Sequence, residues 1–117
     1  MESGTDREEA GGGGDPQHAS FRVEGGPTVV VHVAGELDAD SSPHLRRRLD
    51  EAFESRPRAV AVELADLDFV DSVGLSVLVA AHNRGRTEGT PFEVRNVSAG
   101  PRRILEITGL LDVLDLR

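Results

Sequence analysis

Hydrophobic and polar positions follow two different periods along this chain, one typical of strands and one typical of helices. Residues 21–24 alternate apolar and polar side chains, and after a Gly-Gly-Pro turn the segment 28–34 is rich in Val. This pattern predicts two short strands joined as a hairpin. The run at 59–64 is almost wholly apolar. Such a run is typical of a strand that is covered on both faces in a parallel pairing.

Three other segments carry apolar residues at helical spacing. The first follows Ser41-Ser42-Pro43, which predicts a helix start with Ser as the N-cap and Pro at the first helical position. The second follows Ser72, and the third follows Ala99-Gly100-Pro101 and stops at Gly109. The segment 35–38 is expected to leave the sheet before the first of these helices. The remaining strands are predicted at 91–97 and, more briefly, within 111–116.

The order of these elements predicts an α/β fold. After the hairpin, helices and strands alternate, which favours a sheet with parallel pairs and right-handed crossovers. The 117 residues suffice for one domain with its own core. We expect this domain at 18–117. Residues 1–17 are acidic, rich in Gly and almost free of large apolar side chains, so we expect them to form a disordered tail.

Composition narrows the possible functions. The net charge is −8, and the one basic cluster, Arg46-Arg47-Arg48, is typical of a solvated helix face, so we expect neither a nucleic-acid partner nor a membrane partner. The absence of Cys excludes disulfides and thiolate metal sites. No apolar run is long enough to span a bilayer, and no signal-peptide segment precedes the domain. We therefore expect a cytoplasmic protein without a metal ion or other cofactor.

Asp71-Ser72 is the most informative pair of residues, because it lies between an apolar strand and an amphipathic helix. One interpretation is that Ser72 caps the helix by accepting a hydrogen bond from a free backbone N–H. The other is that Ser72 accepts a phosphate, which the positive end of a helix tolerates well. Gly74 likewise has two interpretations. It allows either close packing of the helix on the sheet or the close approach of another protein.

The helix after Ser72 carries a second apolar line beside its core stripe. The line consists of Val73, Val77, Ala80 and Ala81. A helix that is apolar on two faces is either deeply buried or shares a face with a partner. In a domain with three helices, we expect this second face to contact a partner protein.

Four segments together resemble the STAS family of anti-sigma-factor antagonists. They occur in order at 35–38 (Gly-Glu-Leu-Asp), 60–64, 71–75 (Asp-Ser-Val-Gly-Leu) and 107–110 (Ile-Thr-Gly-Leu). The resemblance covers residues 19–117. It implies a mixed β-sheet of about four or five strands, with about three main helices packed mostly on one side.

The resemblance also implies a function in bacterial partner switching, in responses such as stress or sporulation. An unphosphorylated antagonist of this family binds an anti-sigma factor that is also a serine kinase, which frees the sigma factor. The kinase then phosphorylates the serine that Ser72 matches, the complex dissociates, and a metal-dependent phosphatase of the PP2C type resets the switch. Asp38 matches a loop aspartate that lies near this serine in the family.

Six residues are expected to form or support the docking surface for the partner. They are Asp38, Asp71, Val73, Gly74, Leu75 and Val77. Val73 departs from the family, which commonly has Ser or Thr after the phosphoacceptor. This departure removes an alternative site and makes the surface more apolar.

Two other functions remain open. An enzyme with Ser72 as its nucleophile would need a base, but Ser72 is not in a Gly-x-Ser-x-Gly elbow, and the sequence places none of the four His residues beside it. A STAS module without a phosphoswitch would act as a sensor or scaffold that binds a protein or small ligand. The sequence lacks a phosphate-cradling loop, since the glycines at 11–14 are not followed by Lys-Ser or Lys-Thr.

Overall fold

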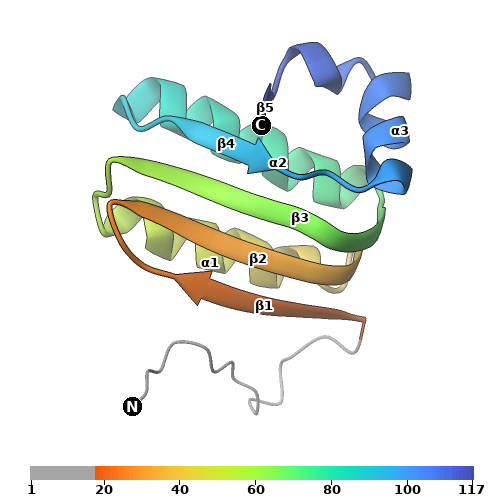
Figure 1. The fold of residues 1–117 in the computed structure, drawn as a ribbon, viewed down its shortest axis with the longest axis horizontal. Helices are drawn as coiled ribbons and strands as arrows, with labels where there is room; N and C mark the ends of the chain where they lie inside the picture. Colours follow the sequence, from red (N-terminus) through yellow and green to blue (C-terminus); the bar gives the residue numbers. More distant parts are fainter. Residues whose placement is uncertain (1–17) are drawn as a thin grey trace.

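Five strands form one mixed sheet in which the spatial order of the strands follows the sequence (Figure 1). The computed structural model describes residues 18–117, so the tail predicted at 1–17 lies outside the described residues. The strands are β1 (Ala19–Glu24), β2 (Thr28–Leu37), β3 (Ala59–Val70), β4 (Phe92–Arg95) and β5 (Asp115–Leu116). β1 and β2 form the predicted antiparallel hairpin, and every later pair is parallel.

Three α-helices complete the α/β fold, as predicted. They are α1 (Ser42–Glu54), α2 (Ser72–Glu88) and α3 (Ala99–Ile107), and a short 3₁₀ helix, η2 (Leu110–Asp112), follows α3. α1 and α2 lie side by side on one face of the sheet. α3 lies at the edge where β3 and β4 end (Figure 1). Gly89 and Gly109 adopt positive φ angles of 74° and 79° where α2 and α3 end, a conformation that Gly adopts without steric cost.

The core fills the space between the sheet and the first two helices. Alternate side chains of the central strands point into it, and the apolar stripes of α1 and α2 meet them. Its fully buried members include Val31, Val33, Leu45, Val60, Val62, Leu64, Leu67 and Leu78. Burying one such side chain completely stabilises the fold by about 1.5–3 kcal/mol before the cost in conformational entropy.

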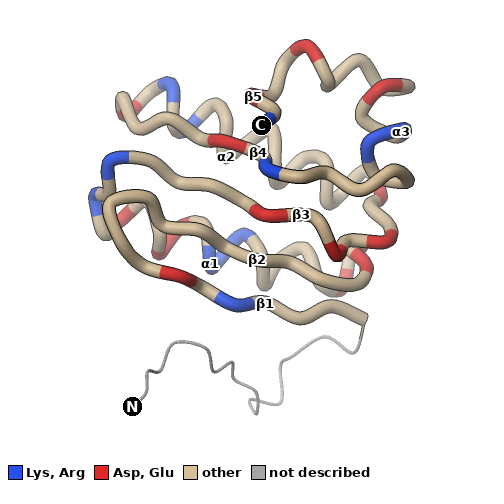
Figure 2. The backbone as a smooth tube through the Cα atoms, in the orientation of Figure 1, with Lys and Arg blue, Asp and Glu red and all other residues tan. Residues whose placement is uncertain are grey.

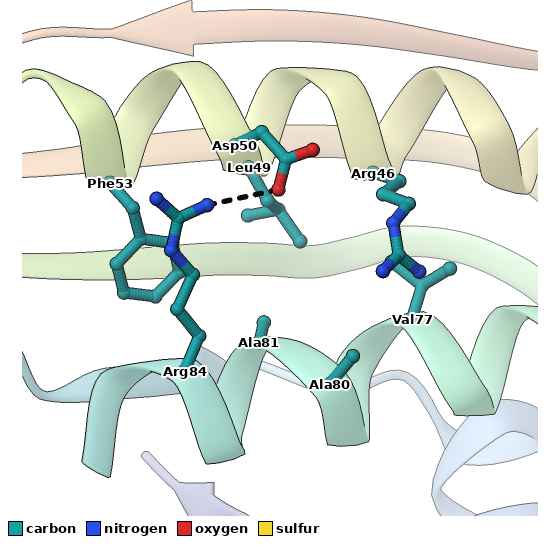
Figure 3. A pocket seen from close by; sticks show the side chains of 8 residues that line it. All are labelled: Arg46, Leu49, Asp50, Phe53, Val77, Ala80, Ala81 and Arg84. Carbon is teal, nitrogen blue, oxygen red and sulfur yellow. Dashed lines mark hydrogen bonds and ion pairs between the residues drawn. The ribbon is translucent and has the colours of Figure 1, made fainter. Parts of the chain in front are cut away.

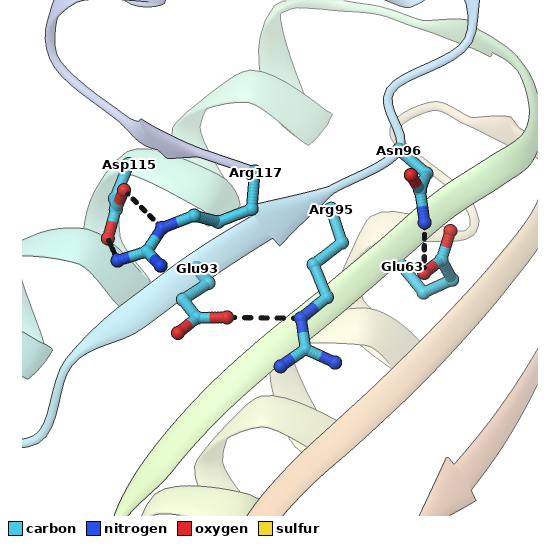
Figure 4. Close-up of polar contacts among 6 residues, drawn as sticks. All are labelled: Glu63, Glu93, Arg95, Asn96, Asp115 and Arg117. Carbon is cyan, nitrogen blue, oxygen red and sulfur yellow. Dashed lines mark hydrogen bonds and ion pairs between the residues drawn. The ribbon is translucent and has the colours of Figure 1, made fainter.

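β3 is buried on both faces at residues 59–62, as expected from its apolar run. α1 and α2 lie on one side only (Figure 1). On the other side Ala61 is buried by the side chains around it, while Glu63 accepts a hydrogen bond of 3.0 Å from Asn96 and Glu93 pairs with Arg95 at 3.0 Å (Figure 4). The opposite face of the sheet therefore combines buried apolar residues, such as Val30 and Ala61, with polar residues, and neither α1 nor α2 covers it.

β2 and β3 are longer than the apolar runs that predict them. Beyond a register shift after His32, the pairing continues through Gly35 with Leu67 and ends with Leu37 opposite Val70. The polar residues of the segment 35–38 led to the expectation that it leaves the sheet. This expectation is wrong at Gly35, because β2 continues to Leu37. Gly35 has φ +97°, and a Cβ on it would collide with the carbonyl of His18. Only Gly fits this irregular but continuous strand.

Candidate functional site at the Ser72 turn

The ends of β2 and β3 bring two loops together. The strands are parallel, so both end at the same edge of the sheet, where Leu37 pairs with Val70. The backbone N–H of Asp71 donates to the carbonyl of Leu37 at 2.9 Å. The structure thereby places the loop that begins at Asp38 beside the turn that contains Ser72.

Asp71, not Ser72, caps α2. The Asp71 carboxylate accepts hydrogen bonds from the backbone N–H groups of Val73 at 2.9 Å and Gly74 at 3.0 Å. Ser72 is the first residue of the helix, so the interpretation of Ser72 as the N-cap is wrong. Asp is as good a cap as Ser, and it comes one residue earlier, where the backbone is still extended.

The Ser72 side chain is exposed at the start of a helix of 17 residues. Within residues 18–117 its hydroxyl has no hydrogen-bond partner. Because Asp71 already satisfies two N–H groups of the first turn, the Ser72 hydroxyl has no structural task to perform there. It is accessible to a second protein.

Asp38 organises its own loop. One of its carboxylate oxygens accepts hydrogen bonds from the backbone N–H of Ser41 at 2.9 Å and of Asp40 at 3.0 Å. The Ser41 hydroxyl, in turn, donates to the carbonyl of Glu36 at 2.7 Å. The hydrogen bonds that Asp38 accepts, led by that of the Ser41 N–H, hold the pKa of Asp38 below its ordinary value, because they favour the ionised carboxylate. Among the described residues, no hydrogen bond joins Asp38 to Ser72.

Gly74 is the contact point between α2 and the sheet. A Cβ at this position would lie 2.7 Å from Cγ2 of Val70 and 3.0 Å from Cβ of Leu37. The helix start can approach the ends of β2 and β3 only without that atom. Gly74 is buried, so its packing role, rather than contact with another protein, explains the glycine.

The expected docking surface separates into exposed and buried residues. Val73 is 40% exposed, whereas Leu75 and Val77 are 8% and 5% exposed and belong to the core. Leu75 and Val77 therefore cannot form a surface for a partner. They can only support one from beneath.

α1 lies opposite Val77 and Ala81 of the second apolar line, which are 5% and 6% exposed, so the expectation that this face is free for a partner is wrong for these two residues, while Val73 stays exposed. Arg84 of α2 reaches across to Asp50 of α1 at 3.1 Å, and its guanidinium lies 5.1 Å from the centre of the Phe53 ring (Figure 3). Only a hollow of about 200 Å³ remains between the helices. Its lining includes neither Ser72 nor Asp38 nor Asp71.

Two of the four histidines have partners away from Ser72. His32 bonds to Glu24 at 2.9 Å, and the His44 ring stacks on Phe21 with a centroid distance of 6.4 Å. In the part of the chain that the structure describes, no group of three or more His, Cys, Asp or Glu side chains could hold a metal ion. No helix in residues 18–117 is both long and apolar enough to cross a bilayer.

Comparison with known proteins decides the family, because the STAS domain matches residues 19–117, which include the Ser72 turn. The chain belongs to the STAS domain family. This STAS domain is 33% identical to the anti-sigma-B factor antagonist of Bacillus subtilis (strain 168) over 75% of this chain and 80% of the relative. It is 29% identical to the anti-sigma F factor antagonist of Paenibacillus polymyxa, over 75% and 76% of the two chains.

A solved structure supports the same assignment. The crystal structure of an anti-sigma factor antagonist from Mycobacterium paratuberculosis superimposes on this STAS domain with a TM-score of 0.77 and 30% sequence identity. The match covers 86% of each chain. The similarity therefore extends over nearly the whole described domain, including both loops at the Ser72 edge.

Carboxylates gather at the edge of this STAS domain that carries Ser72. Figure 2 shows acidic residues where β2 and β3 end. The residues concerned are Glu36, Asp38, Asp40, Asp66, Asp68 and Asp71. The start of α3, which carries the exposed Arg102 and Arg103, also lies against the end of β3. Carboxylates outnumber these cations, so a protein that docks over Ser72 meets a mainly negative field, which favours a partner with a basic face.

Phe69 is a candidate site residue that sequence reasoning missed. It is 46% exposed, unlike the neighbouring Leu67 and Val70, which are 1% and 2% exposed. The apolar run that predicts the strand ends at Leu64, so the sequence pattern does not assign Phe69 to either face of the sheet. Two buried apolar residues that flank Asp68-Phe69 break the alternation of a strand, and this break was the available signal.

Proposed function

We propose that this STAS domain is an anti-sigma-factor antagonist whose binding is controlled by phosphorylation of Ser72. In the unphosphorylated form it binds an anti-sigma factor with serine-kinase activity and frees a sigma factor in the bacterial cytoplasm. Phosphorylation of Ser72 by that kinase ends binding, and a PP2C-type phosphatase restores it. The observation that carries the proposal is that the Ser72 hydroxyl is exposed and does not cap α2, because Asp71 is the cap. The names of the relatives support the regulatory class.

The position of Ser72 suits a reversible modification. A phosphate there brings about −1.5 to −2 charges to the first turn of α2. The backbone N–H groups and the positive end of the helix dipole stabilise that charge. Asp71 opposes it, but the site is exposed and its charges are screened by water and salt. The domain therefore keeps its fold when it is phosphorylated.

A phosphate on Ser72 leaves the fold of the domain intact, but it destabilises the complex with a partner that is docked there. To stay bound over Ser72, the partner would have to strip water from the phosphate, and an unpaired buried charge costs several kcal/mol. A loss of about 4 kcal/mol weakens binding roughly a thousandfold. In this proposal Val73, Asp38 and Asp71 face the partner, and Gly74, Leu75 and Val77 hold the turn in place from beneath.

The decisive experiment measures binding and phosphorylation together. The full chain would be titrated, with and without ATP, against each purified anti-sigma factor of the serine-kinase type from the same organism. Peptide mass spectrometry would then locate the phosphate. We expect binding without ATP, phosphate on Ser72 after ATP is added, and release of the partner.

Three variants sharpen this experiment. Ser72→Ala should bind and resist release by ATP, and Ser72→Asp should fold normally and fail to bind. Ser76→Ala is the matched control, since Ser76 is also exposed and lies one turn further along α2, with its hydroxyl bonded to the carbonyl of Val73 at 2.6 Å. It should behave like the wild type. A bare Ser72 together with an undiminished, ATP-insensitive complex would favour a sensory or scaffolding module instead.

A further inference from the structure

The aromatic residues of this chain are few and unevenly placed. The sequence holds four Phe and no Tyr or Trp. Three of these side chains are in the core, where Phe21, Phe53 and Phe92 are 9%, 3% and 3% exposed. Phe69 is 46% exposed. The one aromatic ring at the surface lies three residues before Ser72.

The strand register fixes the direction of Phe69. Leu37 and Val70 pair with each other and point into the core, at 0% and 2% exposure. Their neighbours Glu36 and Phe69 also pair, just after a second register shift between Gly35 and Glu36, and both side chains are exposed, so they point away from the core. The ring therefore lies at the edge where β2 and β3 end, in the same segment as the Ser72 turn.

Packing within the domain accounts for only part of the Phe69 side chain. Nearly half of its surface remains in water, whereas the other three Phe side chains are buried. In the part of the chain that the structure describes, the Phe69 ring stacks on no other ring and lies under no cation. Aromatic residues, Phe among them, are enriched in the cores of protein interfaces relative to the rest of the surface.

We infer that Phe69 is the apolar anchor of the Ser72 docking surface, and that it inserts into an apolar pocket bordered by basic side chains on the partner protein. The inference rests on the function proposed above and names the chemistry of the partner's face. The pocket must be apolar to accept the ring. Its border must be basic, because Glu36 pairs with Phe69 in the sheet and Asp68 precedes it, and both are exposed carboxylates.

This arrangement explains why phosphorylation can release a basic partner. Charge alone would strengthen the attraction, since a phosphate adds to the negative field that already favours a basic face. A phosphate on Ser72 instead falls next to Val73 and at the same edge of the sheet as Phe69, where, in this inference, the partner's surface is apolar and expels water. Phosphorylation therefore releases the partner because the phosphate would have to lose its water and would disturb the apolar contact. The carboxylates mainly increase the rate of association.

The anchor is tested with a matched pair of variants. Phe69→Ala removes the exposed ring, and Ile107→Ala shortens another exposed apolar side chain, 70% exposed, at the last residue of α3. Both should melt near the wild-type temperature. In titrations without ATP against the anti-sigma factor that binds the wild type, Phe69→Ala should weaken binding about 10- to 100-fold through faster dissociation. Ile107→Ala should leave binding unchanged, and Phe69→Leu should fall between them.

The basic border is tested separately by kinetics. The double variant Glu36→Gln/Asp68→Asn should slow association severalfold at low salt and approach the wild-type rate at high salt. An association rate that is unchanged or faster at low salt would overturn the basic border.

The outcomes separate this inference from the proposed function. If the wild type binds and phosphorylation releases it, but Phe69→Ala binds equally well, the anchor is wrong and the phosphoswitch stands. Equal losses from Phe69→Ala and Ile107→Ala would also contradict a specific anchor. If none of the anti-sigma factors binds the wild type, both the proposed function and the anchor fail.

Discussion

The backbone N–H of Asp71 donates a 2.9 Å hydrogen bond to the carbonyl oxygen of Leu37. This bond joins the residue after β3 to the last residue of β2, and so fixes the Asp38 loop against the start of α2. Both bonded atoms belong to the main chain, so the bond leaves the side chains of both loops free for other contacts. The geometry of the Ser72 edge is therefore set by the sheet rather than by the exposed side chains that a partner would meet.

Gly74→Ala tests how closely α2 must approach that edge. The added methyl would lie 2.7 Å from Cγ2 of Val70 and 3.3 Å from the carbonyl oxygen of Leu37. Ala improves helix propensity by about 1 kcal/mol, but a steric insertion of this kind costs about 1–3 kcal/mol. We expect a net loss in the free energy of unfolding, measured by urea denaturation.

A double variant provides the control for the Gly74 prediction. Val70→Ala removes the methyl group that the new Cβ would meet most closely. The pair Val70→Ala/Gly74→Ala should therefore lose less stability than the sum of the single variants. Strictly additive losses would show that the Val70 contact is not the cause.

Asp71 caps α2 and its neighbour Ser72 is the proposed phosphorylation site, so substitutions at the two residues should have different effects on stability. Asp71→Ala leaves the N–H groups of Val73 and Gly74 without their acceptor and should destabilise the fold by about 0.5–2 kcal/mol. Ser72→Ala should change the free energy of unfolding by less than about 0.5 kcal/mol, since Ser72 is exposed and is not the cap. Asp71→Ser retains a capping oxygen and should recover most of the loss. A larger loss from Ser72→Ala than from Asp71→Ala would reverse this assignment.

The sequence predicts the fold well where its patterns are local. The hairpin follows from alternation in the strand before a Gly-Gly-Pro turn and a Val-rich segment after it, and the end of α3 follows from Gly109, which adopts a left-handed conformation. The parallel pairing of β3 follows from its apolar first half. These features depend on residues close to one another in the chain, so their signals are readable without tertiary contacts.

The sequence is less informative where distant segments decide the outcome. β2 and β3 continue through polar residues because each strand pairs with the other, and neither segment alone predicts that extension. Val77 is buried because α1 packs on α2, which an apolar line on one helix does not reveal. The motif at 71–75 located the turn correctly, but the choice between Asp71 and Ser72 as the cap depends on the backbone conformation of a single residue.

Arg84 links α1 and α2 by charge and by packing, and two substitutions separate these contributions. Arg84→Met keeps an unbranched side chain near the Phe53 ring but removes the ion pairs with Asp50 at 3.1 Å and Glu88 at 2.8 Å. It should cost less than about 1 kcal/mol, and less still at high salt. Arg84→Ala also removes the packing, so its larger loss should persist at high salt. Equal losses from the two variants in thermal melts would show that the packing contributes nothing.

Asp38 should make the stability of the domain depend on pH in the acid range. Its pKa is lowered in the folded protein, chiefly by the Ser41 N–H, so the unfolded chain binds a proton more readily than the folded one. Its contribution to stability is therefore complete above the unfolded pKa of about 3.9 and is lost as the pH falls through the lower folded value. Asp38→Asn can still accept a hydrogen bond but does not titrate. In urea denaturation the stability advantage of the wild type over Asp38→Asn should shrink between neutral pH and pH values below about 3. Asp38→Ala, which also removes the acceptor, should remain less stable than Asp38→Asn throughout this range. If the stability advantage of the wild type over Asp38→Asn instead grew as the pH fell, the pKa of Asp38 would be raised in the folded protein rather than lowered.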